Sequence, residues 1–158
     1  MALVRYFAYG SNLLSGQMRT RCPGHRTSGP AQLPEHRLAF TRRSRNWGGG
    51  VADILPAEGK TVWGLVYELT EADVERLDKH EGHPTLYRRV PVAVTLADGQ
   101  EVRAETYVVV KKAARETRPS AAYLNTIVDG AREHGLPDEY VGFLEGLRAD
   151  DSRWWGKE

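Results

Sequence analysis

The sequence has few of the residues from which disulfides and metal sites are built. Cys22 is its only cysteine, which excludes an internal disulfide and every site that needs several thiolates. It precedes Pro-Gly in a turn-like segment, which favours a structural cysteine over a nucleophile. The five histidines show no HxxxH or HxH pairing with a carboxylate in register. We therefore expect neither a metal nor a cofactor, and His80 with His83 is the remaining alternative for a metal.

Excess charge and long apolar runs are also missing. The chain has 22 lysines and arginines against 21 acids, and a net charge of +1 gives no general attraction for nucleic acid or anionic lipid. No run approaches the roughly 18 apolar residues of a membrane-spanning helix. The opening MALVRYFAYGSN becomes polar too early for a signal peptide. We expect a cytoplasmic protein that binds neither nucleic acid nor membranes.

The bulk composition is that of a folded domain. Its 158 residues match the common size of one domain, and 41% hydrophobic with 27% charged residues is ordinary for a globular protein. We expect a single domain over residues 1–150, followed by a polar tail over 151–158 that contains two tryptophans.

Strand patterns dominate the first two thirds of the chain. Residues 3–9 predict a buried strand that ends in a sharp turn, and residues 13–18 could form a short helix or an irregular segment. Further strands are expected at 31–45, 51–55 and 61–69, with Gly64 marking a bend of the kind found in curved sheets. An Asp-Gly pair predicts a hairpin between strands at 87–96 and 101–110.

Helix signals follow at two places. Thr70 is a good N-cap for a helix that runs to about Glu81 and stops at Gly82. Ser120 begins a second helix that ends at Gly135, and a last helical stretch follows. Together these elements predict an α+β fold with a mixed, strongly curved, barrel-like sheet and flanking helices.

Two short segments before residue 52 can each be interpreted as purely structural or as part of a binding site. Three consecutive glycines at 48–50 have no side chains to keep other atoms away from the backbone. They could form a mobile loop or bulge, or the wall of a pocket where side chains would obstruct a ligand. Arg42, Arg43 and Arg45 form a basic cluster. We interpret the cluster as a solvated strand face or loop, with a site for an anionic substrate group as the alternative.

Glu81 is the candidate for acid/base chemistry. It follows Val74 by seven residues and Leu77 by four, so it lies on the inward stripe of its helix. Burial and the negative end of the helix dipole would raise the pKa of its carboxyl toward neutrality, where it can take and return a proton. Periodicity alone also allows Glu81 to reach solvent or to pair with Arg88 or Arg89.

The turn at residues 9–12, Tyr-Gly-Ser-Asn, is the second candidate element. Glycine and asparagine favour a tight turn that exposes successive backbone N–H groups, which can hold a carboxylate or carbonyl oxygen. Considered by itself, the same segment is an ordinary turn.

These segments resemble the γ-glutamylcyclotransferase family. FAYGSNL at 7–13 is similar to its N-terminal signature, LDKHEG at 77–82 is similar to its LDxxEG segment, and Tyr87 follows at about the family's spacing. Additional matches lie at 47–49, 51–52, 62–64 and 119–144. The resemblance covers about residues 6–147, and the segment 119–144 resembles the branch that acts on γ-glutamyl amino acids more than the branches acting on γ-glutamylamines or antibiotic conjugates.

The resemblance implies a lyase-type reaction without cofactor. The α-amine of a small γ-glutamyl substrate attacks its own γ-carbonyl, which forms 5-oxoproline and expels the amino acid. Glu81 would be the general acid/base. The implied substrate-binding residues are Tyr6, Phe7, Ala8, Tyr9, Gly10, Ser11, Asn12 and Tyr87, and Tyr107 is added from its strand position.

Several alternatives stay open. Tyr87 and Tyr107 could instead be ordinary sheet aromatics, and the helix stripe through Tyr123 and Ile127 is interpreted as core or subunit contact. The substrate could be a γ-glutamylamine or another γ-glutamyl conjugate, or the domain could bind a small metabolite without converting it. A homodimer is an expectation from the family.

Overall fold

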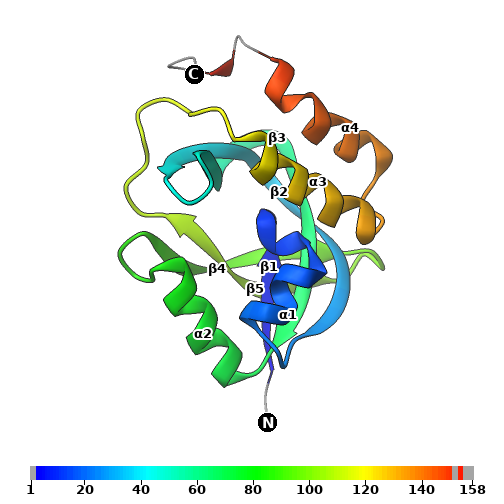
Figure 1. Cartoon of the computed structure of the whole chain (residues 1–158). Coiled ribbons are helices and arrows are strands. Elements are labelled where there is room, and N and C mark those ends of the chain that lie inside the picture. The colour runs from blue at the N-terminus through cyan, green and yellow to red at the C-terminus, as the bar shows by residue number, and fades with distance from the viewer. Residues whose placement is uncertain (1–2, 151–152, 155–158) are drawn as a thin grey trace.

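The computed structural model describes residues 3–150 and 153–154 (Figure 1). The strands of this part form a closed, mixed barrel in the order β1-β3-β2-β4-β5. All neighbouring pairs are antiparallel except β5 and β1, which run parallel at the closure. The predicted curved, barrel-like α+β fold is confirmed. The strand bounds are β1 (Val4–Ala8), β2 (Arg26–Ser44), β3 (Gly49–Leu69), β4 (Tyr87–Leu96) and β5 (Glu101–Val109).

Two long strands, β2 and β3, form most of the barrel wall. The sequence predicted separate strands at 51–55 and 61–69, but β3 runs through both without a break. The intervening segment 56–60 is polar and largely exposed, so its hydrophobic pattern fades. It contains Gly59 at a positive φ and lies opposite the register shift between Pro34 and His36. Register shifts at three places along the pair bend the strands as a barrel requires.

The helices flank the barrel on two sides (Figure 1). The segment after the first turn, which the sequence left undecided, forms a 3₁₀ turn and a short helix because Leu13 and Met18 are buried. The helices at 70–81 and 120–135 were predicted correctly, including their Thr70 and Ser120 N-caps. The helical bounds are η1 (Ser11–Leu13), α1 (Ser15–Arg21), α2 (Glu71–Glu81), α3 (Ala121–Glu133), α4 (Asp138–Gly146) and η2 (Leu147–Ala149).

Glycines allow two close backbone approaches. A Cβ on Gly64 would lie 2.3 Å from the carbonyl oxygen of Ala8, so β1 can pair with β3 only if this position has no side chain. A Cβ on Gly50 would lie 2.0 Å from the carbonyl oxygen of Thr117. Gly49 and Gly50 therefore pack against the chain's own 117–120 segment, whereas Gly48 faces open space at a positive φ. None of the three glycines lines the cavity described below.

The core continues beyond the barrel to Trp154. Its ring is 6% exposed and lies edge-to-face with Phe40, with 5.6 Å between ring centres. Its indole N–H donates to the carbonyl of Leu147 at 3.0 Å, and Arg153 pairs with Glu116 at 2.9 Å. These two residues of the predicted tail are anchored to the domain, while the prediction for Trp155 falls outside the described residues.

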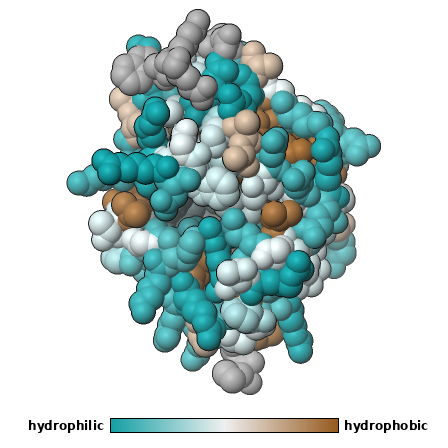
Figure 2. Space-filling view, in the orientation of Figure 1, coloured by the Kyte–Doolittle hydropathy of each residue, from teal (hydrophilic) through white to brown (hydrophobic). Residues whose placement is uncertain are grey.

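The surface seen in Figure 2 is mainly hydrophilic, and its apolar residues lie in small separate patches. Within residues 3–150 and 153–154, the helices are too short or too polar to cross a membrane.

Candidate active site

A cavity of about 400 Å³ opens between the first turn of the chain, the end of α2 and the β2–β3 hairpin. Carboxylate, guanidinium and phenol groups line it, and the size suits a small polar metabolite. The lining residues are Tyr6, Tyr9, Gly10, Ser11, Asn12, Arg21, Arg42, Arg43, Ser44, Arg45, Asn46, Trp47, Val51, Ala52, His80, Glu81, Leu86, Tyr87, Tyr107 and Tyr123.

Glu81 reaches the cavity from the last turn of α2. The helix begins where the Thr70 hydroxyl accepts a hydrogen bond of 3.1 Å from the N–H of Asp73, and it ends at Gly82 in the left-handed conformation. Val74 and Leu77, on the same stripe as Glu81, are buried and fix the rotation of the helix. The helix therefore points the carboxylate of Glu81 inward, as periodicity predicted.

The environment of Glu81 changes its acidity. Burial raises the pKa of its carboxyl from 4.5 to about 7, against the guanidinium groups of Arg21 and Arg42, which lower it. Glu81 is only partly buried as a residue, and it lines the cavity, where a small molecule can reach it. A carboxyl with a pKa near neutrality can accept a proton and return it at physiological pH.

The alternative in which Glu81 pairs with Arg88 or Arg89 is not found among the ion pairs of the described residues. Arg89 instead forms ion pairs of 3.1 Å with both Asp78 and Glu105, and Arg88 is exposed. The cations that act on the carboxylate of Glu81 are therefore Arg21 and Arg42 of the cavity.

The turn after β1 has the geometry expected of an oxygen-binding element. Residues 11–13 form a 3₁₀ turn, and the first N–H groups of such a turn have no acceptor within it. The buried side chain of Asn12 holds the turn in place, since its Oδ1 accepts from Arg21 at 2.6 Å and from Gln17 at 2.9 Å. A Cβ on Gly10 would lie 3.3 Å from the Tyr123 hydroxyl, so glycine keeps this wall open.

Tyrosine side chains form most of the cavity wall. Three hydroxyls donate to fixed acceptors: Tyr9 to the carbonyl of Tyr107 at 2.5 Å, Tyr87 to the carbonyl of Ala52 at 2.9 Å, and Tyr107 to Oδ1 of Asp78 at 2.6 Å. Burial raises the pKa of every one of these phenols above its ordinary value, so they stay neutral. Their hydroxyls therefore hold the wall in shape.

Two other hydroxyls keep a proton to donate. The hydroxyl of Tyr6 accepts from Nδ2 of Asn12 at 2.9 Å, and that of Tyr123 accepts from the N–H of Ala52 at 2.8 Å. The structure records no hydrogen bond from either phenolic proton to another described residue. Burial raises the pKa of both phenols, so each remains a neutral hydrogen-bond donor.

The structure brings most of the predicted site residues together. Phe7 and Ala8 are the exceptions. Both are completely buried in the core and absent from the cavity lining. The carbonyl of Phe7 accepts from the Thr106 hydroxyl at 2.7 Å, so it holds β1 in the barrel. The predicted residues that line the cavity are Tyr6, Tyr9, Gly10, Ser11, Asn12, Glu81, Tyr87 and Tyr107.

The cavity lining also contains residues that the sequence did not assign to the site, among them Arg21, Arg42 and Tyr123. Arg21 lies just beyond the undecided segment 13–18, and the stripe through Tyr123 was interpreted as core or subunit contact. Arg42 was interpreted as part of a solvated face. The sequence did contain one indication of the role of Arg42. The arginine cluster just before the glycine run was also compatible with a site for an anionic substrate group.

Comparison with known proteins agrees with this geometry. The sequence model of the AIG2-like family matches residues 61–144. The γ-glutamylcyclotransferases of Bos taurus and Homo sapiens are 34% and 33% identical to this chain, over 92% of the chain and 79% of each relative. A solved structure of a γ-glutamyl cyclotransferase superposes with a TM-score of 0.88 at 32% identity, over 98% of this chain and 92% of the other.

The closed barrel and its carboxylate cavity, together with these matches, define an enzyme of the γ-glutamylcyclotransferase type. The chain belongs to the AIG2-like family, among the γ-glutamylcyclotransferases.

Proposed function

We propose that the protein converts γ-glutamyl amino acids to 5-oxoproline and the free amino acid, with Glu81 as the general acid/base. The observation that carries the proposal is a carboxyl with a pKa of about 7 in the same cavity as the turn after β1.

The reaction is a cyclisation within the substrate. Glu81 accepts a proton from the substrate's α-ammonium group, and the freed amine attacks the γ-carbonyl carbon to close a five-membered ring. The tetrahedral intermediate carries an oxyanion. Glu81 then gives its proton to the leaving nitrogen and the carbon–nitrogen bond breaks. The ring nitrogen still carries one proton more than a lactam, and this second proton passes through Glu81 to the released amine, which leaves as an ammonium. Each proton that Glu81 accepts is one that it returns, so no water is consumed.

Hydrogen-bond donors of the cavity suit the charge that develops. The N–H groups of the turn at residues 10–12 orient the glutamyl portion, and the neutral Tyr6 hydroxyl is available to donate to the oxyanion. Donors fixed before the reaction stabilise a developing oxyanion without reorganising, which is the usual source of a large rate effect.

The chain needs no nucleophile of its own, because the attacking amine belongs to the substrate. Cys22 is consistent with that requirement: it is fully buried, lies outside the cavity lining, and burial raises the pKa of its thiol to about 12.

The test is release of 5-oxoproline from γ-glutamyl-alanine by the purified protein. Glu81→Gln keeps the shape of the side chain and removes the proton acceptor, so turnover should fall by at least about 100-fold, the lower range for general acid–base catalysis. Glu75→Gln is the matched control, because Glu75 is exposed on the same helix. Unchanged turnover in Glu81→Gln would refute the mechanism.

A panel of substrates separates the related functions. Release of 5-oxoproline from γ-glutamylamines alone would identify an amine-specific cyclotransferase. Calorimetric binding of γ-glutamyl-alanine with no product would instead identify a binding module.

A further inference from the structure

Arg42 is a cavity residue whose position the catalytic steps above do not explain. It lies in β2 directly after a register shift between Phe40 and Arg42, where Thr41 has no partner in β3. The Thr41 side chain points into the core and donates to the buried carboxylate of Asp53 at 2.7 Å. A β-bulge changes the direction of the side chain that follows it, and here it directs Arg42 into the cavity.

The Arg42 guanidinium is held at one place. Its Cζ lies 5.4 Å from the centre of the Tyr87 ring, within the range of a cation–π contact. Tyr87 is itself fixed by the hydrogen bond from its hydroxyl to Ala52. The guanidinium of Arg42 therefore rests on a rigid support.

A donor of this guanidinium is left without a protein acceptor. Nε of Arg42 is buried against the protein without a hydrogen-bond partner among the described residues, so a ligand does not reach it. The structure also records no hydrogen bond from the terminal nitrogens of Arg42 to the described residues, and Arg42 lines the cavity. Polar groups in folded proteins usually have a partner, so donors without one at a cavity wall are suited to a ligand. The two terminal nitrogens form a planar fork that matches a carboxylate.

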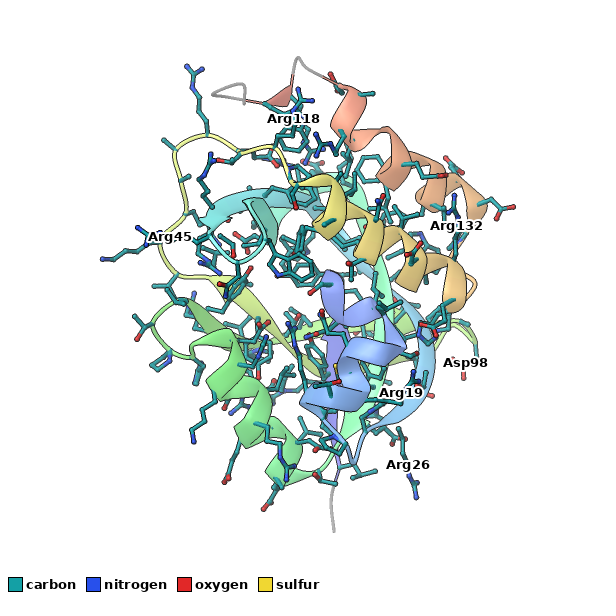
Figure 3. All side chains as sticks on the ribbon, viewed as in Figure 1. Arg19, Arg26, Arg45, Asp98, Arg118 and Arg132 are labelled. Atoms are coloured by element: carbon teal, nitrogen blue, oxygen red, sulfur yellow. The ribbon has the colours of Figure 1, made fainter. Side chains whose placement is uncertain are left out.

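The neighbouring cations are less suited to this task. Arg21 already donates to Asn12 at 2.6 Å. Arg43 and Arg45 are exposed, and Figure 3 shows Arg45 at the outer edge of the molecule. Arg42 is the cavity arginine that combines partial burial, an aromatic support and terminal nitrogens without a recorded hydrogen bond to the described residues.

The substrate of the proposed function carries two carboxylates. One belongs to the glutamyl group and the other to the leaving amino acid, whereas a γ-glutamylamine lacks the second. We propose that Arg42 binds the carboxylate of the leaving amino acid and thereby makes the enzyme prefer γ-glutamyl amino acids to γ-glutamylamines. This inference rests on the proposed function.

A matched pair of substrates tests it. γ-Glutamyl-alanine and γ-glutamyl-ethylamide differ only in the leaving-group carboxylate. The unmodified protein should show a kcat/KM about 10- to 100-fold higher for γ-glutamyl-alanine, the range that a hydrogen bond to a charged group provides. Arg42→Met keeps an apolar stem near Tyr87 and should remove most of this preference. Because Arg42 also lowers the pKa of Glu81, both substrates are compared well above pH 7, where Glu81 is ionised in either protein, and the readout is the ratio of the two kcat/KM values.

Two further variants isolate the role of the fork. Arg42→Lys keeps the charge and should recover only part of the preference, because an ammonium cannot bind a carboxylate in the bidentate way. Arg26→Met changes the net charge equally at the far end of β2, where Arg26 is exposed (Figure 3), and it should leave the ratio unchanged.

The outcomes separate the two proposals. Equal losses on both substrates in Arg42→Met, or equal use of both by the unmodified protein, would overturn the role of Arg42 while the proposed function stands. No 5-oxoproline from either substrate would overturn the proposed function itself. Circular dichroism and thermal unfolding of each variant show whether the fold is retained.

Discussion

The hydroxyl of Tyr107 on β5 donates a hydrogen bond of 2.6 Å to Oδ1 of Asp78, one turn before Glu81 on α2. The same carboxylate accepts from Arg89 on β4 at 3.1 Å. Asp78 thus joins the helix that carries the candidate acid/base to two strands of the barrel. The Leu-Asp pair of the LDKHEG segment therefore positions α2 on the barrel. The leucine packs in the core, and the aspartate binds the helix to the strands through Arg89 and Tyr107.

Replacing this aspartate should loosen the attachment of α2. Asp78→Asn keeps the shape but removes the charge that Arg89 and Tyr107 share, and a lost hydrogen bond to a charged group costs about 1–3 kcal/mol. We expect the free energy of unfolding in urea to fall by that amount. Asp98→Asn, at the exposed hairpin turn labelled in Figure 3, is the control, and an equal loss there would contradict the assignment.

The pH dependence of turnover follows from the pKa of Glu81. The carboxylate must be ionised to accept a proton, so kcat/KM should rise with pH and level off above about 7. Below that midpoint it should fall about tenfold per pH unit. A profile measured by 5-oxoproline release that stays flat down to pH 5 would show that another group accepts the proton.

The raised pKa of Glu81 also predicts how the stability of the fold depends on pH. Turnover should rise with pH, whereas the free energy of unfolding should fall. Glu81 has a pKa of about 7 in the folded protein and an ordinary value near 4.5 when unfolded, so the folded state binds more protons between these values. Stability is therefore lost as pH rises from about 4.5 to 7, by up to about 3 kcal/mol at 1.36 kcal/mol per unit.

Glu81→Gln should therefore unfold at a higher temperature than the unmodified protein at pH 8. The two melting temperatures should converge near pH 5, where the carboxyl is protonated in the fold. Thermal unfolding followed by circular dichroism at both pH values measures this, with Glu75→Gln expected to show no such divergence. A destabilised Glu81→Gln at pH 8 would mean that ionised Glu81 is favourably paired.

Arg21 should tune the acidity of Glu81. Its guanidinium lowers the pKa of that carboxyl, so Arg21→Met should move the midpoint of the pH profile upward. Arg19, exposed on the same helix and labelled in Figure 3, supplies the control Arg19→Met. A midpoint that stays in place in Arg21→Met would show that the two charges do not interact across the cavity.

The sequence by itself determined the local elements. The Thr70 cap, the Val74–Leu77–Glu81 stripe and the Asp-Gly hairpin are set by contacts within a few residues, and the structure has each of them. The curvature of the sheet also followed from local signals, since Gly64 marked the close approach of two strands.

The tertiary structure decided which side chains face the cavity. Tyr6 lines it while Phe7 and Ala8 are core residues, because closure of the barrel, rather than the motif, sets the face of each position in β1. Arg42 enters the cavity through a bulge that no periodicity reveals. The acidity of Glu81 depends on burial and on two arginines distant in sequence, and such long-range electrostatics exist only once the chain has folded.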